Sequence, residues 1–379
     1  MRRILVPLGL VAFIVALAGS RPTEIPFEKH TIDLGASETA AFADINGDGK
    51  LDIVSGEYWY EAPRWTKHRF RELNFTENYI DNFSDLMLDV NHDGRIDVVS
   101  CSWFGKHLRW FEHPSDPNAL WKEHPIETEY HVEFAFLVDI DNDGKAQEIL
   151  PEFGDTQAPL AWYEAKDGAF VKHVVSYKSY GHGIGAGDVN GDGRTDILTP
   201  KGWFEGPTDP RQGEWRFHPD FNLDGLGFMH VVDVNGDGLP DIVTSRAHDY
   251  GIFWLEQGPG GKWIEHKIDD SWSQAHAVVP VQWEAGGRRG FLTGKRYMAH
   301  NGHDPGEREP LGVYWYEMPD PAHGQPEWVK HVIDYSTRTG GGIQIAAADY
   351  DGDGDLDFVV GGKSGLFLFE NLTKTKGRR

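Results

Sequence analysis

The sequence predicts an all-β fold, a seven-bladed β-propeller whose N-terminal strand closes the last blade. A unit of about 45 residues with four short strand-like stretches recurs seven times, as in propeller blades. Five of the units contain a complete acidic loop. Residues 29–33 form a fourth-strand stretch that stands alone before the first loop, while the last unit lacks one. Pairing this stretch with the last unit would leave no open sheet edge.

Each unit is expected to begin with an apolar strand, such as residues 40–43, that runs into the acidic loop. A second short strand leaves the loop, such as residues 53–54. The third strand carries Trp two residues before Glu in six units, and Leu368 with Glu370 in the seventh. The fourth strand carries a histidine in every unit: His30, His68, His124, His173, His218, His266 and His331. Because this histidine recurs with the blade, we expect it to serve packing or hydrogen bonding rather than chemistry.

The acidic loops have the pattern of calcium sites. Oxygen-bearing side chains occupy positions 1, 3, 5 and 9, and a glycine at position 6 allows a sharp turn. A backbone carbonyl is expected from position 7. The expected ligands in the complete loops are Asp44, Asn46, Asp48, Asp52, Asp89, Asn91, Asp93, Asp97, Asp188, Asn190, Asp192, Asp196, Asp233, Asn235, Asp237, Asp241, Asp349, Asp351, Asp353 and Asp357. The sequence therefore predicts about five structural Ca²⁺ ions.

Two loops depart from this pattern. The third keeps Asp139, Asp141 and Asp143 but has Gln147 at position 9 and Glu148 one residue later. This change predicts either a weaker sixth site or a bulge that brings Glu148 inward. The sixth unit lacks the acidic ligand set and is expected to have lost its ion.

The loops and their spacing resemble the FG-GAP and VCBS repeats of integrin α-type propellers, over residues 27–372. That resemblance implies a calcium-binding propeller, and it leaves the function open because this fold serves adhesion modules, lectins and lyases. A shorter resemblance, to the propeller domain of aldos-2-ulose dehydratases, rests on histidines at the inner strands, His230 and His276. The cupin-like domains of those enzymes have no counterpart in this sequence.

The N-terminus predicts export. Arg2 and Arg3 precede an apolar run over residues 4–18, so residues 1–20 are expected to be a signal peptide, with an uncleaved anchor as the alternative. The protein is then secreted or periplasmic. Cys101 is the only cysteine, which excludes an intrachain disulfide. Residues 373–379 are expected to fray.

The net charge of the chain limits the kinds of binding partner that we expect. The formal net charge of −24 argues against binding to nucleic acid or to anionic membranes. After signal cleavage no membrane association is expected. A carbohydrate or other polar ligand is expected instead, and a protein partner is the alternative.

A ligand site is expected at the mouth of the ring opposite the acidic loops, where loops lead into the first strand and join the second to the third. Ionisable side chains gather there in a pattern that the repeat does not explain. The expected ligand-binding residues are Glu38, Asp85, His131, Glu133, Tyr180, Lys201 and His300. A polar rim without a ligand is the alternative, but ionisable groups converging on a concave surface favour a binding site.

Two function classes remain. The first is a carbohydrate lyase or dehydratase, in which a histidine abstracts a proton next to a carbonyl and a cation stabilises the developing charge. The candidates are His182, His230 and His276 for proton transfer and Arg246 and Lys295 for charge stabilisation. The second is a binding module for glycan or protein without turnover.

The longest insertion, residues 295–308, is either a lid over the mouth or structural drift. Its His300, His303 and Asp304 could also hold a zinc-type metal together with His248 or His276. No nucleophile elbow, phosphate loop or dinucleotide motif occurs in the sequence.

Overall fold

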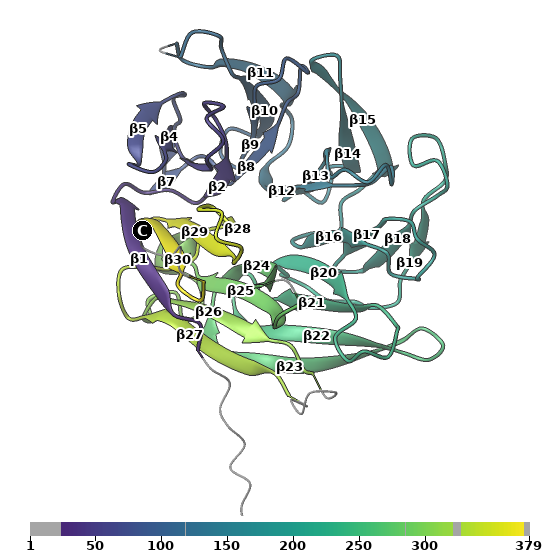
Figure 1. Cartoon of the computed structure of the whole chain (residues 1–379). Coiled ribbons are helices and arrows are strands. Elements are labelled where there is room, and N and C mark those ends of the chain that lie inside the picture. Colours follow the sequence, from purple (N-terminus) through teal and green to yellow (C-terminus); the bar gives the residue numbers. More distant parts are fainter. Residues whose placement is uncertain (1–23, 118, 285, 321–326, 375–379) are drawn as a thin grey trace, which may run out of the picture.

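The computed structural model describes residues 24–117, 119–284, 286–320 and 327–374. The predicted signal peptide and residues 375–379 of the predicted tail lie outside the described residues. The regular structure of the described chain is β-strand, which confirms the all-β class, and among the described residues the one helical element is the short 3-10 turn η1 (Ala299–Gly302). The sheets surround a central axis, and strands β2, β8, β12, β16, β20, β24 and β28 lie nearest to it (Figure 1).

Four sheets, each of four antiparallel strands, follow the chain in order. They are β2 (Ala41–Ala43), β3 (Asp52–Ser55), β4 (Tyr58–Glu61) and β5 (Thr66–Arg69); β8 (Ser84–Leu88), β9 (Asp97–Ser102), β10 (His107–Glu112) and β11 (Lys122–Glu127); β12 (Val132–Val138), β13 (Glu148–Phe153), β14 (Leu160–Lys166) and β15 (Ala169–Ser176); and β24 (Ala275–Gln282), β25 (Arg289–Lys295), β26 (Gly312–Glu317) and β27 (Val329–Tyr335). A small hairpin of β6 (Phe75–Thr76) and β7 (Tyr79–Ile80) precedes β8.

The N-terminal strand completes the last sheet, as predicted. This sheet has the order β1 (Phe27–Asp33), β30 (Gly365–Asn371), β29 (Asp357–Gly362) and β28 (Ile345–Ala348). Strand β1 pairs antiparallel with β30, from Phe27 opposite Asn371 to Asp33 opposite Leu366. Figure 1 shows β1, in purple, beside β30, in yellow.

The remaining strands form one eight-stranded sheet, so the structure does not have the seven separate sheets that the sequence predicts. Its two halves are β16 (Ile184–Gly187), β17 (Asp196–Thr199), β18 (Gly202–Glu205) and β19 (Arg216–His218), and β20 (Phe228–Val232), β21 (Asp241–Ser245), β22 (Tyr250–Gly258) and β23 (Lys262–Ser273). Parallel pairing of β16 with β20 joins them. A Cβ atom at Gly185 would lie 2.0 Å from the carbonyl oxygen of Met229, so glycine permits this close backbone approach.

Each recurrent histidine contacts side chains of its own repeat unit, which confirms the predicted packing role. In six blades the Trp of the third strand stacks on the fourth-strand histidine, with ring centroids 4.1 to 4.5 Å apart. The same histidine contacts the Glu two residues after the Trp at 2.7 to 3.1 Å. In the last sheet His30 lies opposite Leu368 and bonds to Glu370 at 2.9 Å. We call this Trp–His–Glu unit the blade clasp.

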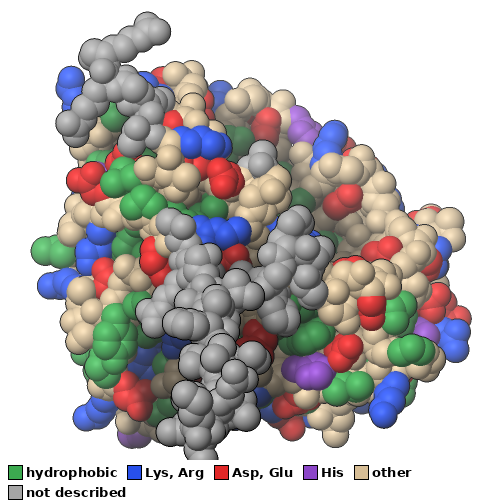
Figure 2. All heavy atoms as spheres, turned by 60° about the horizontal axis from the view of Figure 1, so that its bottom comes forward, with side chains coloured by type: hydrophobic (Ala, Val, Ile, Leu, Met, Phe, Trp, Pro, Cys, Tyr) green, Lys and Arg blue, Asp and Glu red, His purple; other side chains and the backbone are tan. Residues whose placement is uncertain are grey.

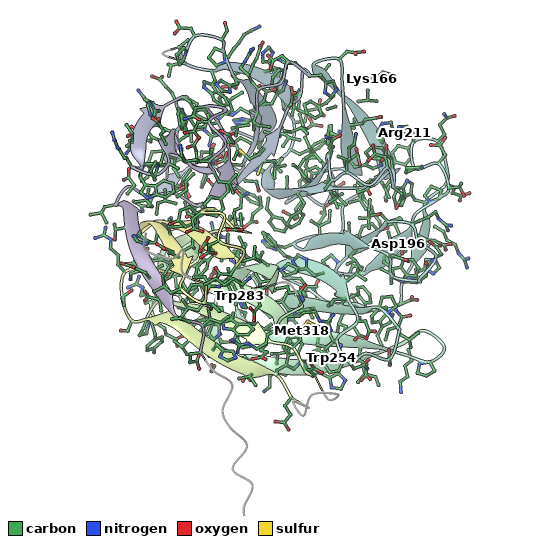
Figure 3. The ribbon with its side chains drawn as sticks, in the orientation of Figure 1. Lys166, Asp196, Arg211, Trp254, Trp283 and Met318 are labelled. Atoms are coloured by element: carbon green, nitrogen blue, oxygen red, sulfur yellow. The ribbon has the colours of Figure 1, made fainter. Side chains whose placement is uncertain are left out.

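Position 9 of each complete acidic loop is a buried carboxylate that accepts two backbone N–H groups. One N–H comes from position 2 of the same loop and the other from the residue after the clasp Glu, at 2.8 to 3.1 Å. We call these five residues the anchor carboxylates: Asp52, Asp97, Asp196, Asp241 and Asp357. Figure 3 labels Asp196 at the start of β17. In the third loop Glu148 is buried and accepts the Ile140 N–H at 2.9 Å, so its side chain turns inward as predicted, in regular register opposite Val138.

Acidic and basic side chains are interspersed on the face shown in Figure 2. Among the described residues, no helix has the length and apolar character that crossing a membrane requires.

Candidate functional site

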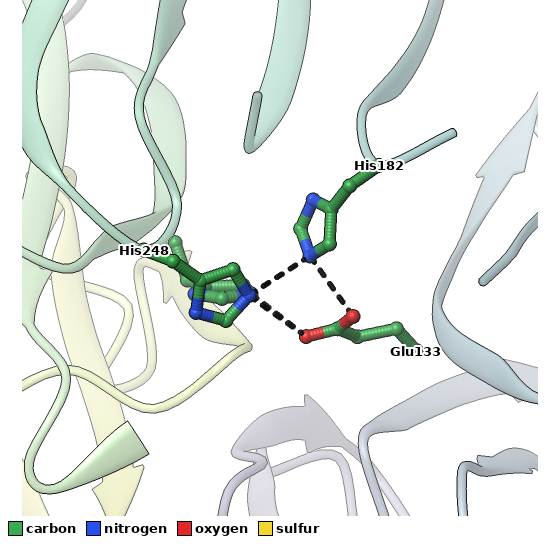
Figure 4. A group of neighbouring side chains, drawn as sticks. Glu133, His182 and His248 are labelled. Atoms are coloured by element: carbon green, nitrogen blue, oxygen red, sulfur yellow. Dashed lines mark hydrogen bonds and ion pairs between the residues drawn. The ribbon is translucent and has the colours of Figure 1, made fainter. Parts of the chain in front are cut away.

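Four side chains from separate parts of the chain converge at the mouth. Glu133 lies on β12, His182 just before β16, His248 in the loop between β21 and β22, and His276 on β24. Each offers one ligand atom, and these four atoms lie within 4.8 Å of one another. Figure 4 shows His182 and His248 pointing toward the Glu133 carboxylate. We call this group the His-Glu centre.

The carboxylate of Glu133 lies between the three histidine rings of the centre. Its Oε2 is 2.9 Å from Nε2 of His182, and its Oε1 is 3.0 Å from Nε2 of His276. Nε2 of His248 lies 3.7 Å from the same Oε1 and 3.2 Å from Nε2 of His182. The three imidazole rings meet at angles of 76 to 81°, so their Nε2 atoms face a common point from different directions.

Two of the rings are oriented through their outer nitrogens. Nδ1 of His182 donates to the Leu226 carbonyl at 2.5 Å, and Nδ1 of His248 donates to Asp304 at 3.0 Å. When these rings are neutral, each therefore carries its proton on Nδ1 and directs the Nε2 lone pair to the centre. Glycine at position 183 is required locally, because φ there is +119° and a Cβ atom would lie 2.7 Å from Leu226.

Burial and mutual charge set the protonation of the centre. Burial would raise the pKa of Glu133, but His182 and His276 outweigh it and hold that pKa well below the usual range. Burial opposes charge on His182, yet Glu133 raises its pKa to about 9. Burial, together with Arg296, holds the pKa of His276 well below its ordinary value, and burial lowers the pKa of His248 despite Asp304. The centre thus combines an ionised carboxylate and two neutral imidazoles with one imidazolium.

This donor set fits a divalent metal of the zinc type. Three imidazole nitrogens and one carboxylate are common Zn²⁺ ligands, and the neutral ring of His248, with its proton on Nδ1, presents the form that binds metal. The Nε2 atoms of His182 and His248 approach to 3.2 Å, a distance at which two lone pairs repel unless a proton or cation lies between them. The orientation of imidazole through a carboxylate or carbonyl is also typical of metal ligands.

A pocket of about 320 Å³ opens beside the centre and shares Glu133 with it. One part of its wall is aromatic: Tyr79, Phe83, Trp103 and Phe104. The rest is polar: Glu77, Glu133, Arg296, His300, Asn301 and His303. A volume of this size and a mixed wall of this kind are typical of small-ligand sites.

Arg296 connects the pocket to a buried carboxylate behind it. Its Nε donates to Glu38 at 3.1 Å, and its guanidinium lies 3.7 Å from Glu133. The side chains of Arg296 and Glu38 are both buried. Arg296 therefore holds a positive charge behind Glu133 and stabilises its ionised form.

A larger hollow, about 490 Å³, lies among the first two acidic loops. The histidines in its wall are His68, which belongs to a blade clasp, and His113, which stacks on Trp121 at 4.3 Å. Both histidines therefore have structural partners, and the His-Glu centre remains the stronger candidate site.

Comparison with known proteins identifies the fold. No family model and no curated protein matches this chain. Among solved structures, the exotype rhamnogalacturonan lyase YesX is 12% identical, with a TM-score of 0.51, over 91% of this chain and 73% of that one. BBS1N, in complex with ARL6DN, is 11% identical with a TM-score of 0.56 over 94% and 98%. The β-propeller domain of Cps50 (Swd1) from Myceliophteria thermophila is 12% identical with a TM-score of 0.52 over 91% and 99%.

The chain is a β-propeller. At these identities the likeness concerns the fold alone. The propeller brings together some of the residues that the sequence predicts for its site: His182, His276 and Glu133 in the centre, and His300 in the pocket wall. Glu38 lies behind them and contacts the pocket through Arg296.

The propeller places the other predicted catalytic residues elsewhere. Nε2 of His230 donates to the Val278 carbonyl, and burial lowers the pKa of its ring to about 4. Lys295 is buried, and its Nζ donates to the hydroxyl of Ser273 at 2.8 Å. The guanidinium of Arg246 donates to the Asp224 carbonyl. None of these three contacts joins the His-Glu centre.

The remaining predicted ligand-binding residues also have structural partners. Asp85 is buried in an ion pair with Arg71 at 2.7 Å, where neither side chain is exposed. Tyr180 stacks on Phe217. Nδ1 of His131 donates to the Trp103 carbonyl at 2.6 Å, and Lys201 pairs with Asp224.

Sequence reasoning missed Arg296, although it directly follows Lys295, a predicted catalytic residue that ends β25. Successive side chains of a strand point to opposite faces, so only one of the two can reach the mouth. The sequence does not show which one does, and the propeller turns Arg296 toward the pocket.

Proposed function

We propose that this chain is an exported, calcium-stabilised, seven-bladed propeller that binds a carbohydrate-type ligand at the mouth opposite the acidic loops and eliminates a group from it as a lyase or dehydratase. The observation that carries the proposal is the convergence of Glu133, His182, His248 and His276 beside a pocket with an aromatic side, to whose wall Glu133 also belongs. We further propose that these four residues hold a zinc-type metal ion.

The count of seven blades is supported by the His–Glu contact of the blade clasp, which recurs in seven places including both halves of the eight-stranded sheet, six of them with the stacked Trp. We therefore take the eight-stranded sheet as two blades whose inner strands, β16 and β20, pair because glycine replaces a side chain between them.

The proposed calcium ions would neutralise the acidic loops. In the last loop, for example, oxygens of Asp349, Asp351 and Asp353 lie within 4.8 Å of one another. Such carboxylates repel one another unless a cation lies between them. In the third loop Asp139, Asp141 and Glu148 make a comparable group, which supports a sixth site. Export is supported by the predicted signal peptide and would bring the protein into calcium-rich surroundings.

The pocket residues have separate tasks in the proposed reaction. Trp103 and Phe104 offer flat apolar surface for a sugar ring, and Glu77 and Asn301 offer hydrogen-bonding groups for its hydroxyls. Glu133, His182, His248 and His276 hold the metal, which when bound would polarise a carbonyl oxygen of the ligand. His300 is half-exposed in the pocket wall, and Asp304 bonds to its Nδ1 at 3.0 Å.

His300 is accordingly the residue best placed to accept a proton at Nε2. In the elimination, a C–H proton next to the carbonyl passes to His300 and its electron pair forms the C=C bond. The C–O bond to the leaving group breaks, and the departing oxygen takes the proton back from His300. Water leaves in a dehydratase reaction and an alcohol leaves in a lyase reaction.

The structural likeness to a rhamnogalacturonan lyase supports a carbohydrate ligand, because it shows that this fold can carry such chemistry. A binding module without turnover is the second candidate. The aromatic side of the pocket favours it as well, since stacking serves recognition and catalysis equally.

The test is a screen for unsaturated products by ultraviolet absorbance. Purified mature protein with Ca²⁺ and Zn²⁺ is mixed with a panel of polyuronates and keto sugars. The expected result is absorbance growth with one substrate class, its loss in His276→Gln, and its retention in the matched control His266→Gln, which alters a blade clasp on β23. A flat response together with retained binding of a panel sugar would reject catalysis and favour the binding module.

A further inference from the structure

Asp304 joins the insertion between β25 and β26 to the His-Glu centre. Its carboxylate accepts Nδ1–H of His248 at 3.0 Å and Nδ1–H of His300 at 3.0 Å. The two rings stack with centroids 4.2 Å apart and an interplanar angle of 19°. One carboxylate thus aligns a residue of the centre with a residue of the pocket wall.

The hydrogen bond from His248 to Asp304 determines whether Nε2 of His248 carries a proton. With the proton held on Nδ1 by Asp304, the Nε2 of His248 is left as an acceptor directed at His182 and Glu133. A carboxylate behind an imidazole in this way fixes the tautomer and the ring plane and raises the basicity of the inner nitrogen. Asp304 therefore acts on the centre without belonging to it.

The segment that carries Asp304 is held in an unfavourable backbone conformation by several hydrogen bonds. Met298, His300 and Asn301 all have positive φ, at 46°, 48° and 56°, which is unfavourable for residues other than glycine. Three contacts hold this backbone: Lys363 Nζ donates to the Met298 carbonyl at 2.7 Å, the His300 N–H donates to the Tyr79 hydroxyl at 2.7 Å, and the Asp304 N–H donates to the buried Glu307 at 3.1 Å. Strained backbone held by several contacts is characteristic of functional segments.

We infer that Asp304 is a positioning residue for His248, so that metal binding at the His-Glu centre and ordering of residues 298–308 are coupled. This role presupposes the metal centre of the proposed function. Coupling of this kind is reciprocal: if the ordered segment strengthens metal binding, bound metal must stabilise the ordered segment by the same factor.

The first experiment measures affinity for Co²⁺ and Zn²⁺ by titration of the full chain, with excess Ca²⁺ to occupy the acidic loops. Asp304→Ala is expected to weaken binding about 10- to 100-fold, the usual effect of losing such a partner. Asp304→Asn is expected to weaken it less, because the amide oxygen still accepts the His248 proton. The control is Asp224→Ala, which removes an exposed mouth carboxylate paired with Lys201 and should leave affinity unchanged.

The second experiment measures hydrogen exchange of residues 298–308 with and without Zn²⁺. Bound Zn²⁺ is expected to slow exchange there in the wild type and in Asp224→Ala but not in Asp304→Ala. Unchanged exchange in the blade strands of each variant would confirm that it is folded.

The outcomes separate this role from the proposed function. A wild type that binds neither Co²⁺ nor Zn²⁺ under these conditions would overturn the metal centre and the coupling with it. A wild type that binds, with the same affinity and the same protection in Asp304→Ala, would overturn the coupling alone. A second Zn²⁺ equivalent that disappears with Asp304 would make Asp304 a metal ligand and would also overturn the positioning role.

Discussion

Replacing the anchor carboxylate Asp196 by alanine should be among the most damaging single changes in the propeller. Asp196 is fully buried, and its two oxygens accept the N–H groups of Val189 and Gly206, both at 2.8 Å. Alanine would leave both N–H groups buried without a partner. Each such group costs about 1–3 kcal/mol, so the free energy of unfolding should fall by about 2–6 kcal/mol. Because typical domains are stable by about 5–15 kcal/mol, this loss would be a large share of the total.

Chemical denaturation in Ca²⁺-containing buffer, followed by tryptophan fluorescence, measures the change. Asp196→Asn should lie between wild type and Asp196→Ala, because the amide keeps one acceptor oxygen and turns its NH₂ group toward the other N–H donor. Glu214→Ala, at an exposed carboxylate of the same blade, should change the free energy by less than about 0.5 kcal/mol. A loss below 1 kcal/mol in Asp196→Ala, with the loop's calcium affinity unchanged, would refute the anchoring role.

Three further outcomes are expected. Removal of Ca²⁺ with a chelator should lower the melting temperature, and Ca²⁺ but not NaCl should restore it. Each site should contribute about 2.7 kcal/mol to the free energy of unfolding when the Ca²⁺ concentration is 100 times the Kd of that site. An unchanged melting curve would contradict the proposed calcium sites. Arg71→Met should destabilise the fold by about 3–5 kcal/mol in a denaturant titration, because it leaves the buried Asp85 carboxylate without its cation, and a loss under 1 kcal/mol would contradict this. Burial lowers the pKa of Lys363 to about 8, so above that pH the folded protein holds fewer protons than the unfolded chain. The free energy of unfolding should therefore rise between about pH 8 and 10.5, by an increment that the Lys363→Met variant lacks. Identical pH profiles of stability in the two proteins would argue against the shift.

Much of the fold could be predicted because the sequence pattern that specifies it repeats along the chain. The clasp residues and the acidic loops recur at blade length, and the isolated stretch at residues 29–33 pointed to its pairing with the last unit. The joining of eight strands into one sheet could not be predicted in this way. It depends on how closely Gly185 lets β16 approach Met229 of β20, and that is a property of the assembled ring.

The site was less accessible to sequence reasoning. His182, His230 and His276 all stand at inner strands, yet only two of them turn their inner nitrogen to Glu133 while the third bonds to Val278. The outcome depends on strand rotation and on distance from the axis, which no single repeat encodes. Asp85 illustrates the other difficulty, since Arg71 reaches it from the preceding loop and removes it from the mouth.

The pairing of β1 with β30 places the chain's break inside a blade rather than between two blades. The Leu372 N–H donates to the Pro26 carbonyl at 2.8 Å, so segments almost 350 positions apart share one ladder. The ring therefore cannot close until the final strand has emerged, and this late, non-local step should dominate the folding time. Until then β1 has an unpaired edge that other strands can join. The seam therefore delays closure of the ring until both of its strands, β1 and β30, are available to pair.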